Sequence, residues 1–177
     1  MLFVDITAIL PYTPRNGVVM RSWIDDLKRQ DVEQQVAFAN SNALRLHDAG
    51  VVRAKAPDLW KLLITQIEAD FKGLKEAFPN DLGRQGELIQ RGDSYIIRGR
   101  KLPISIMKLS LNLNGSCIKI SQATKQEFAD HPTLMPSKPI DFKVLDDEDV
   151  VFFWKNWMYA DPTALAETLV KLTCRIS

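Results

Sequence analysis

Five basic side chains in the middle of the chain come nearest to the type and spacing of a binding site. Residues 84–125 contain eight basic and two acidic residues, whereas the whole chain of 177 residues has a net charge of +1. Alternate residues of a strand point to one face of a sheet. Predicted turns at Gly92-Asp93 and Asn114-Gly115 place five cations on the same face of the predicted sheet. These are Arg91, Arg98, Arg100, Lys108 and Lys119.

Such a face could bind phosphate groups, because arginine forms paired hydrogen bonds to their oxygens. The interpretation favoured by the sequence is plainer: the solvated side of a half-buried sheet, kept cationic against edge-to-edge pairing. A protein interface is a third alternative. Sheets that bind single-stranded nucleic acid add aromatic stacking platforms, and the parity of Tyr95 turns it inward. Binding of an anionic ligand or nucleic acid is therefore the weaker alternative.

Aromatic residues suggest a second candidate site. They could line an apolar small-molecule pocket between the sheet and the helices. Such a pocket could bind a ligand or serve as the active site of an enzyme. Packing in the core is the favoured role, because aromatic side chains dominate cores and no polar group converges on these. The candidates are Trp60, Trp154, Trp157 and Tyr159.

Catalytic and metal-binding chemistry find little support. His47 and His131 have no ligand partner at a familiar spacing, and Cys117 and Cys174 are too far apart for a zinc knuckle. The sequence has no glycine-rich phosphate loop, serine elbow or metal-binding helix motif. We therefore predict no catalytic residue, no metal and no cofactor. For Cys117, an inert thiol is favoured over the alternative of catalysis together with a distant histidine.

The hairpin around Asn114-Gly115 is the strongest local signal and must position the cations. Apolar and polar residues alternate through 107–113 and again through 117–121. A two-residue turn pairs Leu111 with Ile118, Leu109 with Ile120, and Ser110 with Lys119. Both strands then present apolar residues to one side, which fixes the core face of the sheet.

The remaining elements are predicted from the periodicity of apolar residues and from helix-capping residues. Residues 1–20 form an arm in which Leu2, Val4, Ile6, Ala8 and Leu10 alternate as in a strand. Residues 21–79 are helical: one or two helices begin at Ser22 and end at Gly50, and another begins at Pro57. Strands occupy 86–160, and a helix capped by Asp161 occupies 161–177, burying Leu165, Leu169, Leu172 and Ile176.

These elements predict a single α+β domain, 1–177. About six strands form an antiparallel meander, with the N-terminal helices and the C-terminal helix on one face. Two cysteines and the absence of a signal peptide or an apolar span of ~18 residues place the protein in the cytoplasm. The function favoured is a non-enzymatic interaction or regulatory module that self-associates as a dimer, with a protein partner as a further option and no membrane contact.

Overall fold

The computed structural model describes residues 16–112, 117–125 and 133–176. The chain divides into two compact units, Met1–Arg45 and Leu46–Ser177. The described part of the first unit is helical and belongs to α1, which continues into the second unit. The elements are α1 Asn16–Ala77, β1 Gly86–Arg91, β2 Ser94–Gly99, β3 Ile104–Leu111, β4 Cys117–Lys125, β5 Met135–Val144, β6 Val150–Trp154, β7 Trp157–Tyr159 and α2 Pro162–Cys174, with a 3₁₀ turn at Leu82–Arg84.

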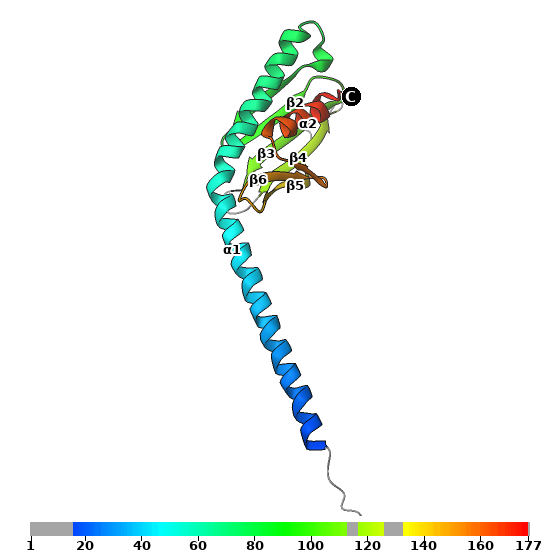
Figure 1. Ribbon diagram of the computed structural model, residues 1–177. Coiled ribbons are helices and arrows are strands. Elements are labelled where there is room, and N and C mark those ends of the chain that lie inside the picture. The colour runs from blue at the N-terminus through cyan, green and yellow to red at the C-terminus, as the bar shows by residue number, and fades with distance from the viewer. Residues whose placement is uncertain (1–15, 113–116, 126–132, 177) are drawn as a thin grey trace, which may run out of the picture. The chain divides into compact units, whose positions relative to one another are not determined.

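Seven antiparallel strands pair in chain order, β1 to β7, and confirm the predicted α+β meander. Figure 1 shows the strands following one another, with α2 lying against them. The seventh strand, β7, was not predicted. Its turn consists of Lys155 and Asn156 at φ 50° and 70°. Two consecutive positive φ angles define the type of hairpin turn that fits the twist of strands. Lysine is not typical of such a turn, so the sequence does not predict it.

The predicted hairpin register is confirmed on both of its strands. Leu111 pairs with Ile118, Leu109 with Ile120, and Ser110 with Lys119. Leu109 and Ile118 are fully buried and Ile120 is 2% exposed, so the apolar parity does face the core. The turn itself, Asn114-Gly115, lies outside the described residues, as do the predicted strand at 2–10 and His131.

Helix α1 is continuous where the sequence predicts a break, so the predicted end at Gly50 and start at Pro57 are wrong. It also begins at Asn16, ahead of Ser22. An interior glycine costs about 1 kcal/mol and an interior proline about 3 kcal/mol relative to alanine. Buried residues on both sides of Pro57 offset that cost, because they continue one apolar stripe through it. This stripe comprises Val52, Ala56, Leu63, Ile64, Ile67 and Phe71.

One face of the sheet carries the core, packed against α1 and α2. Asp161 caps α2 as predicted: its Oδ1 accepts a hydrogen bond from the amide of Thr163 at 2.8 Å. Leu165 and Leu169 are fully buried. Leu172, predicted to be buried, is 44% exposed. The buried face of α2 contains the next two residues, Thr173 and Cys174, instead.

Two glycines allow the helices to approach the sheet. A Cβ at Gly86 would lie 2.9 Å from the carbonyl oxygen of Arg98 and would collide with the Phe71 ring of α1. A Cβ at Gly99 would meet the carbonyl group of Thr173 in α2. Both positions therefore require glycine for close packing rather than for an unusual φ. Neither described helix has an apolar stretch long enough to cross a bilayer.

Candidate functional site

The strand register places four of the five candidate cations on the sheet face opposite the core. Arg91 pairs with Ser94, Ser94 with Ser110, and Ser110 with Lys119. Lys108 pairs with Ile96, on the same parity as Ser94. Arg98 shares that parity, and Arg100 follows the end of β2. We call this surface the basic face.

The basic face is neither purely cationic nor free of partners. The guanidinium of Arg98 donates to Oε1 of Glu87 at 3.3 Å across β1 and β2. Half-buried isoleucines share the parity of the cations: Ile89 pairs with Ile96, and Ile106 with Arg98. A strong anion site would leave its arginines available for paired hydrogen bonds. This mixture is more typical of a solvated sheet surface.

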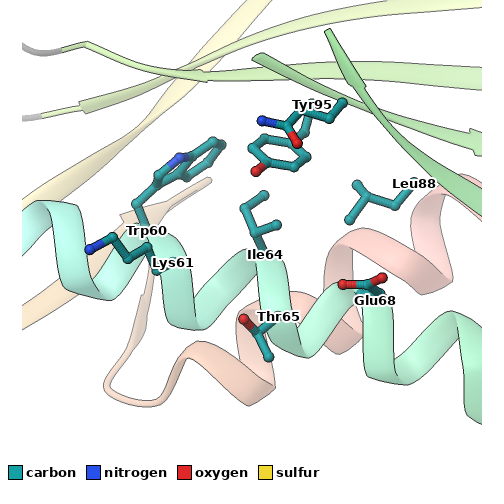
Figure 2. Close-up of a pocket in the computed structure, with 8 residues that line it drawn as sticks. Trp60, Lys61, Ile64, Thr65, Glu68, Leu88 and Tyr95 are labelled. Atoms are coloured by element: carbon teal, nitrogen blue, oxygen red, sulfur yellow. The ribbon is translucent and has the colours of Figure 1, made fainter. Parts of the chain in front are cut away.

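A groove lies on the core side of the first strand, between α1 and β1. Two adjoining hollows form it, of about 330 Å³ and about 440 Å³. Both are lined by Trp60, Lys61, Gln90 and Tyr95. The rings of Trp60 and Tyr95 meet edge to face, with centroids 5.7 Å apart. Figure 2 shows these rings together with Ile64 and Leu88 facing one another between the helix and the sheet. We call this surface the β1 groove.

Sequence reasoning identified Trp60 as a pocket residue but placed different residues beside it. Trp154 is 1% exposed, and its indole N–H donates to the carbonyl oxygen of Lys138 at 3.1 Å. Trp157, its cross-strand partner, is 70% exposed. Tyr159 is half-buried and pairs with Phe152. The residues that accompany Trp60 in the β1 groove come from β1 and β2. In the sequence, the observation that pointed to these residues was the parity of Tyr95, which turns its side chain toward the core.

The acidic turn between β5 and β6 contacts α1 in the second unit. The Lys55 ammonium donates to the carbonyl oxygen of Glu148 at 2.7 Å. Nε2 of His47 lies 3.4 Å from Oε1 of Glu148, and its Nδ1 lies 3.6 Å from Oδ1 of Asp48. His47 thus has an exposed, structural setting between two carboxylates.

The two thiols have different surroundings. Cys117 is half-buried, and its Sγ accepts a long hydrogen bond of 4.0 Å from the side-chain Nδ2 of Asn112. Cys174 is fully buried, and that burial raises the pKa of its thiol to about 11. A raised pKa suppresses the thiolate, which is the nucleophilic form. Cys174 is therefore a packing residue.

An apolar stripe in the first unit is a further candidate surface; the sequence predicted it as part of a helix but not as a binding surface. Val32, Val36, Ala39 and Ala43 follow spacings of four, three and four residues along α1. Val32 is 58% exposed and Val36 53% exposed. We call these four residues the α1 stripe. A stripe with this spacing is typical of a helix that pairs with another helix.

The described residues contain no group of three or more His, Cys, Asp or Glu side chains that could hold a metal ion. Comparisons with protein-family models, curated proteins and solved structures found no match to this chain. The surfaces described above are therefore the basis for any functional conclusion.

Proposed function

We propose that this protein is a non-enzymatic interaction module that self-associates by pairing the α1 stripe with that of a second copy in a parallel coiled coil. The observation that carries the proposal is the exposure of apolar side chains on a helix beside which the described residues place no second element of the same unit. A single helix cannot bury its own apolar stripe, so a partner must cover it.

The composition of this helix also calls for a partner. Asn40, Ser41 and Asn42 lie consecutively within it, and Val32 and Val36 are β-branched. All of these residues have lower helix propensity than alanine or leucine. Helices in proteins gain most of their stability from packing an amphipathic face. Pairing with a second copy supplies that packing.

The flanking residues favour a second copy in parallel. With Val36 and Ala43 at the a positions and Val32 and Ala39 at d, Lys28 lies at g and Glu33 at the following e position. Parallel coiled coils pair g residues with e residues of the partner helix, so Lys28 would face Glu33 of the second copy. The next such pair, Gln35 and Asn40, is uncharged. Both pairs are compatible with self-association.

Substitution of the α1 stripe should abolish the dimer. We expect size-exclusion chromatography with light scattering to give twice the chain mass of 20.1 kDa for the natural protein. We expect Val36→Glu with Ala43→Glu to give the monomer mass, because four carboxylates would meet at the helix seam.

The matched control is Gln34→Glu with Ser41→Glu, which adds the same charge at the f positions, away from the seam. This control should remain dimeric. A strictly monomeric natural protein at micromolar concentration, or equal behaviour of the two variants, would contradict the proposal.

A further inference from the structure

The first strand of the sheet has a free edge. Strand β1 stands at one end of the strand order and pairs only with β2 among the described residues. It is six residues long, whereas β7 at the other end has three. An edge strand of this length presents a row of unpaired N–H and C=O groups that can bind another strand.

The turn after β1 determines which backbone groups face that edge. Arg91 pairs with Ser94 across the two-residue turn. In an antiparallel pair, alternate residues exchange hydrogen bonds with the neighbouring strand, beginning with the pair that closes such a turn. Gln85, on the same parity as Arg91, accordingly accepts a hydrogen bond from the amide of Arg100 at 3.2 Å. The backbone groups left for the free edge belong to Gly86, Leu88 and Gln90.

The side chains on the outer face of β1 are complementary to the same strand run in reverse. Glu87, Ile89 and Arg91 share the sheet face opposite the core. When two identical strands pair about a two-fold axis, residue i meets residue j of the partner and j meets i. With Ile89 at the axis, Glu87 of each strand lies directly opposite Arg91 of the other. Opposite charges in such positions stabilise a strand pair.

We propose that β1 of a second copy of this chain occupies the free edge, antiparallel to β1 of the first and related to it by a two-fold axis at Ile89. The two sheets then form one continuous sheet. Every residue of this interface belongs to the second unit. It is therefore a second self-association surface, separate from the α1 stripe and independent of helix pairing.

This register satisfies the backbone and the charges together. It sets Leu88 opposite Gln90 of the second copy, so two residues whose backbone groups face the edge bond to each other. A shift by one residue would oppose these free groups to groups that already bond to β2. A shift by two residues would set Glu87 opposite Ile89 or Asp93 and would lose both charge pairs.

The β1 groove adds a second set of complementary charges on the core face. Lys61 lines both hollows together with Gln90, and Glu68 lines one of them together with Leu88. Figure 2 shows Lys61 beside Trp60 and Glu68 below Leu88. Because Leu88 lies opposite Gln90 of the second copy, Glu68 of each copy comes to the side of Lys61 of the other. The two faces of the sheet thus favour the same register.

Covalent capture tests this interface. One strand from each copy buries a small area, which is typical of weak association, and a disulfide traps pairs that chromatography would separate. The background is Cys117→Ser with Val36→Glu and Ala43→Glu, which removes the half-buried thiol and the pairing of the α1 stripe. In it, Ile89→Cys should give a nonreducing gel band at twice the chain mass under mild oxidation. The two Cα atoms at the axis would lie about 4.5 Å apart, within disulfide range.

The matched control is Arg91→Cys in the same background. Arg91 is exposed and Ile89 is half-buried, so random collision would favour oxidation of the control. In the proposed register the two copies of residue 91 lie four positions apart along the strands, about 13 Å at 3.3 Å per residue. This control should therefore stay reduced.

Charge reversal tests the cross-strand pairs. Added to the Ile89→Cys protein, Arg91→Glu should slow cross-linking about tenfold, because Glu87 would then meet a like charge twice. Glu87→Arg should slow it similarly. An equal mixture of these two variants should recover the original rate, since both pairs of the mixed dimer have opposite charges. A folding defect in either variant would persist in the mixture.

Three outcomes would overturn the proposal: no cross-link in the Ile89→Cys protein, equal cross-linking of the Arg91→Cys control, or a mixture that reacts no faster than its components. The first of these includes the case in which a foreign strand occupies the edge. The α1 stripe is substituted in every arm, so neither success nor failure depends on helix pairing.

Discussion

At the scale of single residues, the buried thiol of Cys174 connects packing to pH. Burial raises its pKa from 9.0 to about 11, and the unfolded chain restores the ordinary value. The unfolded chain therefore loses this proton first as the pH rises. The stabilisation is complete below pH 9 and declines between pH 9 and pH 11, with a total on the order of 3 kcal/mol at about 1.4 kcal/mol per pKa unit.

Replacement of that thiol should flatten this part of the pH profile. We expect Cys174→Ala to lose less unfolding free energy between pH 9 and pH 11 than the natural protein does, because alanine has no proton to release. Urea unfolding at both pH values measures the difference, and Cys117→Ser is the matched control. Parallel pH profiles for Cys174→Ala and the natural protein would contradict the assignment.

At the scale of elements, Pro57 is the point where α1 gains most from a substitution. It lies inside the helix, lacks the N–H that would bond to the carbonyl of Arg53, and is exposed. Pro57→Ala restores that donor without changing the core, so we expect the free energy of unfolding to rise by up to about 3 kcal/mol. Thermal unfolding followed by circular dichroism measures the change.

The control for that variant is Ala54→Ser, an exposed change in the same helical turn that supplies no missing hydrogen bond. It should leave the midpoint within a few degrees of the natural value. A lower midpoint for Pro57→Ala would show that proline holds the helix in a geometry that alanine does not keep.

Local pattern predicted the sheet better than it predicted α1. Register in the β3–β4 hairpin follows from parity, which the sequence displays directly, as at Leu109 and Ile120. Gly50 and Pro57 are strong local signals for a break, but a buried stripe that runs through Pro57 overrides them. Tertiary packing of this kind has no signature within a short window of sequence.

The candidate sites also differ in how far the sequence alone could predict them. Parity alone placed the cations of the basic face together. The β1 groove, in contrast, requires knowing that α1 lies beside an edge strand, so Trp60 could not be assigned to Tyr95 in advance. The α1 stripe was present in the sequence, but its exposure was not predicted, because the N-terminal helices were expected to pack on one face of the sheet.

At the scale of the whole molecule, the two units should differ in how they depend on concentration. The second unit has its own core, built from the sheet and both helices. The helix of the first unit has exposed Val32 and Val36 and the weak helix formers Asn40, Ser41 and Asn42. Segments with few buried contacts open at low free energy. Dissociation of the proposed dimer should therefore unfold the first unit before the second.

Hydrogen exchange at two protein concentrations tests this expectation. On dilution below the dissociation constant of the dimer, the amides of residues 23–45 should lose protection from exchange, whereas those of β2, β3 and β4 should keep it. The reason is that only this part of the helix depends on dimer formation for its packing, and dimer formation depends on protein concentration. The variant Val36→Glu with Ala43→Glu should resemble the diluted protein at every concentration. Protection of residues 23–45 that is equal at all concentrations and in that variant would show that α1 is stable without a second copy, and the dimer would lose its physical basis.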